Sequence, residues 1–201
     1  MTNYICLDNQ IINLTDEQVK EIKKSLKFRC KLAEIPVGET FTAGEYEFIV
    51  LEHSKATTAV ILKNLLGDDI TFGSSNNYKG SNVDKICEDF AEKLADILGS
   101  HAVVEHTVDL TSDDGLKDYG KIQRRASLLT ANQYRRYIEI LDKHKIDAWW
   151  WLATAFSTPT HDSHNWTKAV SPSGCILNYS YSNFDSGVRP FCILKSNIFV
   201  S

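Results

Sequence analysis

Hydrophobic positions near the start of the chain follow first strand spacing and then helical spacing. Residues 3–14 predict two short strands around a turn at residues 8–9. Thr15 and Gln18 then stand at the spacing of a capping box and predict a helix, whose narrow apolar stripe suits docking on one surface. We therefore expect a small hairpin-and-helix unit over residues 1–33 and a second domain over residues 34–201.

The middle of the chain predicts a hairpin and two helices. Residues 46–53 and 57–65 are strand-length apolar runs separated by a polar turn. Ser81 caps a helix that ends at Gly99, and Thr130 with Gln133 opens a further helix over residues 130–144. The first helix has one apolar face, made of Val83, Ile86, Cys87, Phe90, Leu94, Ile97 and Leu98, and the second is expected to bury Tyr134, Ile138 and Leu141.

From residue 147 onward the pattern predicts short strands and no further helix. The strand candidates are residues 148–155, 165–171, 174–182 and 187–195. Because side chains alternate along a strand, Trp149 and Trp151 should face one way and Trp150 the other, with at least one face covered. This order of elements predicts an α+β fold with helices packed on antiparallel sheets.

Composition and charge narrow the class of protein. The 201 residues are 43% hydrophobic, enough for a sizeable core, and the formal net charge is −4. A chain of this charge lacks the basic surface that binds nucleic acid, so we expect no nucleic-acid partner. One local basic group, Lys121, Arg124, Arg125, Arg135 and Arg136, is interpreted as a solvated face balanced by nearby acids.

No signal peptide and no apolar run of membrane-spanning length is found, so we expect no membrane insertion and a cytoplasmic location in the host, or the virion. The five cysteines are odd in number and lie in apolar segments, which favours buried thiols over a disulfide framework. They are Cys6, Cys30, Cys87, Cys175 and Cys192.

Candidate catalytic motifs are few. His161, Asp162 and His164 could hold a transition metal, but an exposed polar loop is the simpler interpretation, since the spacing is not that of a helical zinc motif. Residues 111–115 (TSDDG) are interpreted as an Asx-type turn and not as a calcium loop. Motifs of serine hydrolases and nucleotide enzymes are missing. We predict a protein that is not an enzyme and that carries no cofactor, although a cysteine nucleophile with a distant histidine stays open.

The interval after the tryptophans is rich in the residue types that recognition surfaces prefer. Trp, Tyr, Asn and Ser give contact area and adaptable hydrogen bonds at low cost in side-chain entropy. The predicted binding residues are His161, Asp162, His164, Asn165, Trp166, Asn178, Tyr179, Tyr181, Asn183 and Phe184.

The last third of the chain resembles a family of uncharacterised phage and prophage proteins. The resemblance lies in Trp150, Trp151 and Leu152, then Val170 and Gly174, and finally Gly187, Val188, Arg189 and Pro190. That family is similar to the C-type lectin fold of formylglycine-generating enzymes, which is also found in variable receptor-binding proteins. The resemblance covers residues 34–201.

The resemblance implies a C-type-lectin-like domain that displays a ligand-binding surface between the first and last of these motifs. The expected function is a phage or prophage binding protein that recognises a host or phage protein or a cell-surface receptor, in virion adhesion or in inhibition of a host defence protein. The alternative is a metal- or thiol-dependent enzyme related to formylglycine-generating oxidases. Those oxidases hold copper with a close cysteine pair, whereas Cys175 stands alone here and Cys192 lies beyond the last motif.

Overall fold

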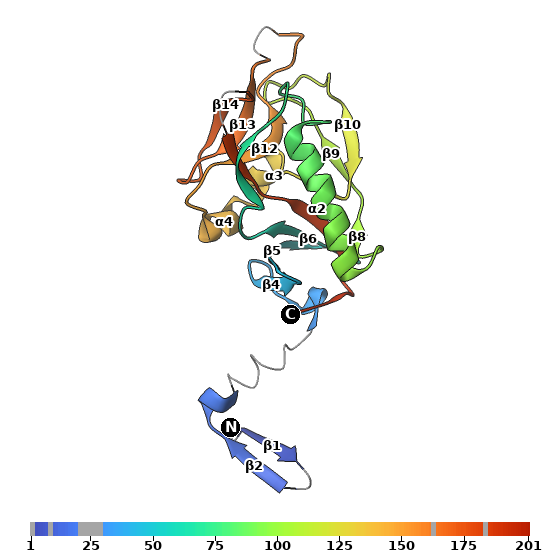
Figure 1. Ribbon diagram of the computed structural model, residues 1–201, viewed down its shortest axis with the longest axis vertical. Helices are drawn as coiled ribbons and strands as arrows, with labels where there is room; N and C mark the ends of the chain where they lie inside the picture. Colours follow the sequence, from blue (N-terminus) through green and yellow to red (C-terminus); the bar gives the residue numbers. More distant parts are fainter. Residues whose placement is uncertain (1–2, 8–9, 20–29, 162–163, 183–184) are drawn as a thin grey trace.

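The computed structural model describes residues 3–7, 10–19, 30–161, 164–182 and 185–201. Over these residues the chain is a mixed helix-and-sheet protein in which strands outweigh helices (Figure 1). None of the helices in these ranges is both long and apolar enough to cross a lipid bilayer.

The N-terminal hairpin is confirmed. β1 (Asn3–Leu7) pairs antiparallel with β2 (Gln10–Leu14), while the predicted turn between them lies outside the described residues. The capping box is also confirmed: the Gln18 backbone N–H donates to Thr15 Oγ1 at 3.2 Å, and the Thr15 backbone N–H donates to Gln18 Oε1 at 3.0 Å. Residues 16–19 are helical, and the rest of the predicted helix is outside the described ranges. The division at residue 33 stays a prediction.

Two sheets form the body of the molecule. The larger has the strand order β11-β16-β6-β5-β4, with β8 also paired to β16. Its strands are β4 (Thr40–Ala43), β5 (Tyr46–His53), β6 (Thr57–Leu62), β8 (Val103–Val104), β11 (Ala126–Ser127) and β16 (Phe191–Lys195). The hairpin predicted over residues 46–65 is therefore present as β5 and β6, which are antiparallel.

The second sheet has the order β14-β13-β12-β15-β7. Its strands are β7 (Gly67–Thr71), β12 (Trp150–Ala155), β13 (Trp166–Val170), β14 (Ile176–Ser180) and β15 (Asp185–Val188). The expectation of wholly antiparallel sheets is wrong at one place, because β12 and β15 run parallel. After β12 the chain forms β13 and β14 on one side of β12. It then crosses over, and β15 pairs with the other side of β12.

Shorter elements complete the fold. A hairpin joins β9 (His106–Asp109) to β10 (Lys121–Arg124), and β3 (Cys30–Lys31) pairs with β17 (Phe199–Val200). Two 3-10 turns are present: η1 (Leu32–Glu34) directly follows β3, and η2 (Asp142–His144) precedes β12 (Trp150–Ala155).

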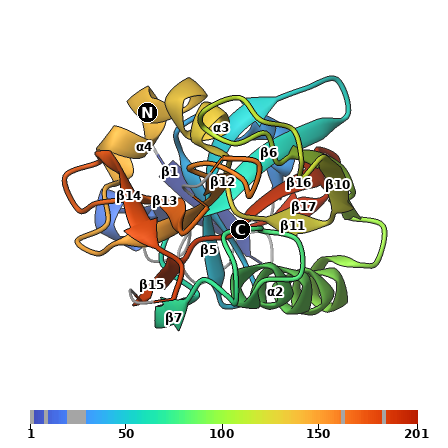
Figure 2. The same ribbon diagram turned by 90° about the horizontal axis from the view of Figure 1, so that it is seen from above.

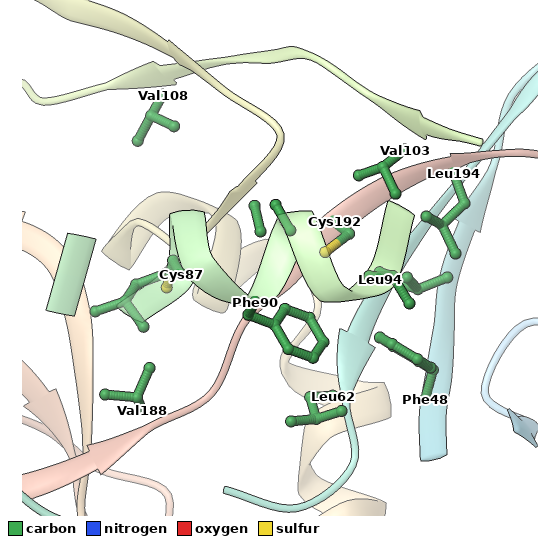
Figure 3. Packing of buried hydrophobic residues seen from close by; sticks show 14 of the residues in the cluster. Phe48, Leu62, Cys87, Phe90, Leu94, Val103, Val108, Val188, Cys192 and Leu194 are labelled. Carbon is green, nitrogen blue, oxygen red and sulfur yellow. The ribbon is translucent and has the colours of Figure 1, made fainter. Parts of the chain in front are cut away.

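The helix α2 (Asn82–Leu98) covers one side of the strands. Ser81 Oγ accepts the Asp84 backbone N–H at 3.1 Å and caps its first turn, and the backbone turns to a positive φ at Gly99, where the helix ends. Its residues Cys87, Phe90 and Leu94 lie against side chains of β5, β6 and β16 (Figure 3). The predicted apolar face is correct except at Ile97, which is exposed in the last turn.

Two core clusters lie on opposite faces of the central strands. The first contains Phe48, Val60, Trp151 and the buried face of α2; the second contains Ile49, Ile61, Trp150 and Leu152 with the helices after residue 130. α2 is on one side of the strands, and α3 (Ala131–Arg136) and α4 (Ile138–Leu141) are on the other (Figure 2). The alternation predicted for the tryptophans is thus confirmed.

The helix predicted over residues 130–144 is interrupted. Thr130 and Gln133 form the predicted capping box, but the helical conformation breaks at Tyr137, which separates α3 from α4. Tyr137 is buried there, and its hydroxyl donates to Glu52 on β5 at 2.8 Å. Tyr134 and Leu141 are buried as expected, and Ile138 is half-buried.

The last motif of the family resemblance has structural roles. A Cβ at Gly187 would collide with Leu65 Cδ1, so any larger residue there would force the Leu65 side chain to move. Arg189 is fully buried, donates to the Leu62 and Lys63 carbonyl oxygens at 2.9 and 3.1 Å, and lies over the Trp150 ring. Burial lowers the pKa of this guanidinium to about 10. Arg189 thus serves the fold by binding backbone carbonyl oxygens inside the protein.

Candidate recognition surface

The loop that carries the histidines leaves the end of β12 and returns at the start of β13. One buried amide joins these two ends: Asn76 Nδ2 donates to the carbonyl oxygens of Ser157 and Trp166 at 2.8 and 3.0 Å. Asn76 Oδ1 in turn accepts the Tyr119 hydroxyl at 2.6 Å. With donor and acceptor groups engaged, this side chain fixes the base of the loop, since breaking any of these bonds would leave a polar group buried without a partner.

Two carboxylates from the 111–120 loop hold the same base. Asp114 accepts the Ser157 hydroxyl at 2.6 Å and lies 3.0 Å from His161 Nδ1. Asp118 Oδ2 accepts the hydroxyls of Thr158 and Thr160, each at 2.5 Å. The hydrogen bonds keep both carboxylates ionised: those from Ser112 and Ser157 lower the pKa of Asp114 strongly, and those from Thr158 and Thr160 lower the pKa of Asp118.

The first half of the predicted binding set lies on this loop. His161, His164, Asn165 and Trp166 are all exposed, and Trp166 keeps 44% of its surface open to solvent. Asp162 lies outside the described residues. The loop is therefore exposed as predicted, but His161 is joined to Asp114, a contact that sequence spacing did not indicate.

The second half lies on β14 and just beyond it. Asn178 is exposed, Tyr179 and Tyr181 are half-buried, and Asn183 and Phe184 lie outside the described residues. The Tyr179 ring meets Trp149 edge to face at 4.5 Å between centroids. The Tyr181 N–H donates to the Asn165 carbonyl oxygen at 3.4 Å, so the loop end and β14 are brought together.

An open polar cleft of about 480 Å³ lies beside the loop base. Its lining includes Ser112, Asp113, Asn132 and Arg135. Asp113 bridges two cations, Arg135 at 3.1 Å and the largely buried Lys168 at 2.7 Å. Burial alone would raise the pKa of Asp113, but the hydrogen bonds from Lys168 and Arg135 lower it overall.

Sequence reasoning missed the residues that support this surface. Asn76, Asp114 and Asp118 come from two loops that are distant in sequence, and their polarity alone predicts only turns. An Asx turn forms just before the 111–115 segment, where the Thr111 backbone N–H donates to Asp109 Oδ1 at 3.0 Å, and the segment itself turns through a bond from the Gly115 N–H to the Ser112 carbonyl at 2.9 Å. The only sequence signal was the concentration of Asp, Ser and Thr in two loops.

The five basic residues are balanced by acids, as predicted, and each has its own partner. Lys121 pairs with Asp109, Arg124 with Asp84, Arg125 with Glu92, Arg135 with Asp113 and Arg136 with Glu52. Their charges are therefore neutralised locally.

The thiols differ from the prediction at two positions, the first of which is Cys30, which is only half-buried. No disulfide joins the cysteines whose side chains are described, and Cys87 and Cys192 are buried, but Cys175 is exposed in the turn before β14. Burial raises the pKa of Cys87 to about 12 and that of Cys192 further, so both stay protonated and are poor nucleophiles. Cys6 has no described side chain.

Other chemistry at the loop is limited by its hydrogen bonding. The Ser157 hydroxyl is buried and donates to Asp114, whose strongly lowered pKa makes this carboxylate a weak base for activating it. Within the described ranges no three His, Cys, Asp or Glu side chains gather as a metal-binding group.

Comparison of the chain with family models, with curated proteins and with solved structures gives no match. The resemblance of the last third to phage and prophage proteins, and with it the C-type-lectin-like fold, stays a prediction.

Proposed function

We propose that this chain is a binding protein of phage or prophage origin, with a C-type-lectin-like domain, that recognises a host or phage protein or a cell-surface receptor. Its recognition surface is formed by the exposed residues Pro159, Thr160, His161, His164 and Asn165, together with Trp166, Asn178 and Tyr181. Virion adhesion and inhibition of a host defence protein are both roles that such a surface can serve.

One observation carries the proposal: an exposed tryptophan and an exposed polar loop stand on a fixed base. Asn76, Asp114 and Asp118 hold the two ends of the loop, while Trp166 keeps 44% of its surface in solvent. A large exposed aromatic is a common centre of binding energy, and a fixed base lowers the entropy that binding must remove.

The proposal is tested by capture of a partner from lysate of the host cell, followed by titration of variants. Trp166→Ala should weaken association by about 2 kcal/mol, roughly a thirtyfold rise in Kd, and leave the melting temperature unchanged. Phe199→Ala is the matched control, because Phe199 is also an exposed aromatic but lies on β17. Equal loss in both variants, or none in Trp166→Ala, would move the interface away from this surface.

Metal analysis of the purified chain separates this proposal from an enzyme. Stoichiometric copper, iron or zinc, retained after dialysis and lost in a His161→Ala, His164→Ala double variant, would favour metal-dependent chemistry at the loop.

A further inference from the structure

β14 is the outermost strand of its sheet. It pairs with β13 on one side, and in the described part of the chain no strand pairs with its other side (Figures 1 and 2). An open edge of this kind presents backbone N–H and C=O groups in the geometry that another strand requires.

The hydrogen-bond pattern identifies the groups at this edge. At the two ends of the β13–β14 ladder, Ser171 N–H donates to the Cys175 carbonyl at 2.9 Å and Tyr181 N–H donates to the Asn165 carbonyl at 3.4 Å. Because bonded pairs alternate along an antiparallel ladder, the outward peptide groups are those of Ile176, Asn178 and Ser180. No backbone hydrogen bond from another described residue reaches these three.

Two other outer strands, β7 and β4, are protected where β14 is not. β7 carries the exposed Asp68 and Asp69, and the outer side of β4 is hydrogen-bonded through Thr42 to the terminal Ser201. By contrast, the sequence holds no charged residue between Lys168 and Asp185, an interval that contains all of β14. Charges are the usual protection of an open edge.

We propose that two copies of this chain pair through β14, antiparallel about a twofold axis at Asn178. In this register Asn178 lies opposite Asn178 of the other copy, and Ile176 lies opposite Ser180, each pair exchanging two backbone hydrogen bonds. Leu177 of one copy lies opposite Tyr179 of the other, which covers an aliphatic side chain that is 45% exposed in the single chain.

The charge pattern selects a second copy as the occupant. A residue at a twofold axis meets its own kind, so a charge at Asn178 would be placed against an identical charge, and charges elsewhere on the strand would be repeated in both copies. A neutral strand avoids this repulsion. The inference goes beyond the proposed function, because it concerns the backbone edge of β14. It places Asn178 of the proposed recognition surface in the seam between the two copies and leaves Trp166, His161 and His164 available to a different partner.

The first test measures the mass of the full chain in solution by sedimentation over a range of micromolar concentrations. The expected mass is twice 22.7 kDa. Asn178→Lys places two ammonium groups at the axis and should reduce the mass by half, while its circular dichroism stays unchanged. Asn197→Lys adds the same charge at another exposed asparagine, outside β14, and should remain a dimer. A monomeric parent chain, or a dimer that Asn178→Lys leaves intact, overturns the proposal.

The second test reads the register and does not depend on the lysine variant. Cα atoms of a hydrogen-bonded antiparallel pair are about 5.5 Å apart, which a disulfide can span. In a Cys175→Ser background, Asn178→Cys should form a covalent dimer under mild oxidation, because the two cysteines lie opposite each other. Leu177→Cys should not, because residue 177 of one copy lies opposite residue 179 of the other. Pairing about Asn178 is contradicted if both variants cross-link equally, or if neither cross-links. Hydrogen exchange at Ile176 and Ser180 that slows only when a foreign polypeptide is added would instead assign the edge to that polypeptide.

Discussion

His106 gives a sharp prediction about stability and pH. Its side chain is 7% exposed, with Nε2 2.9 Å from Ser127 Oγ and the ring edge to face with Phe191 at 5.1 Å. Burial lowers the pKa of this imidazole from 6.5 to about 4, and the backbone of Val104 offsets only part of that. In the folded chain His106 is therefore neutral where an unfolded histidine already binds a proton.

The sign and size of the effect follow from proton linkage. The unfolded chain takes up this proton below pH 6.5, whereas the folded chain takes it up only near pH 4. The stability that His106 contributes is thus fully present above pH 6.5 and is lost as the pH falls toward 4. At about 1.4 kcal/mol per pKa unit, the shift corresponds to a loss of about 3 kcal/mol in the free energy of unfolding.

The assay compares urea unfolding of the parent chain and of His106→Gln at several pH values between 7.5 and 4. Glutamine does not titrate in this range and keeps a polar group toward Ser127. The acids and the other histidines are common to both chains, so the difference between the two unfolding free energies isolates His106. We expect that difference to fall by about 3 kcal/mol, with the change beginning near pH 6.5. Curves that stay parallel throughout would refute the reasoning.

Three further predictions concern packing and the loop. Trp151→Ala should cost about 3 to 5 kcal/mol in urea unfolding, because the ring is fully buried and its Nε1 donates to the Ile70 carbonyl at 2.7 Å; near-normal stability would show that the site collapses without loss. Asn76→Ala should cost about 2 kcal/mol or more, since it leaves buried polar groups unpaired, and a melting temperature within a degree of the parent would contradict the role of Asn76 as the tie between the loop ends. The double change of His161 and His164 to alanine should alter stability by only about 0.5 kcal/mol, because both side chains are exposed; a fall of more than about 5 °C in Tm would show that the loop supports the fold.

The helices and strands with a regular hydrophobic pattern could be predicted from sequence, because the signals that specify them lie close together along the chain. The α2 helix is specified by a cap at Ser81, an apolar face and a glycine end, and the β5–β6 hairpin by two apolar runs around a polar turn. Each of these signals lies within about twenty residues. The break at Tyr137 has no such local signal, and the partner that holds the Tyr137 hydroxyl, Glu52, is 85 residues away in sequence.

The sequence could predict which residue types form the candidate site, but not which distant residues hold them in place. The exposure of the histidine loop follows from its polar residue types, and the alternation of Trp150 and Trp151 follows from strand geometry. The parallel entry of β15, the exposure of Cys175 and the contacts of Asn76 depend on which distant loops meet, and a single sequence gives no measure of that.

The tie between Ser157 and Trp166 through one asparagine has a consequence for how this chain can change. The ends of the loop are joined whatever residues stand between them, so the tip can be exchanged or lengthened without disturbing the β12–β13 pairing. Since loop-closure entropy grows only slowly with length, doubling such a segment costs about 0.6 kcal/mol. An insertion between His161 and Asn165 keeps the Asn76 tie and the contacts of Thr160 and His161 with Asp118 and Asp114, so foreign binding sequences can be grafted there on an unchanged scaffold.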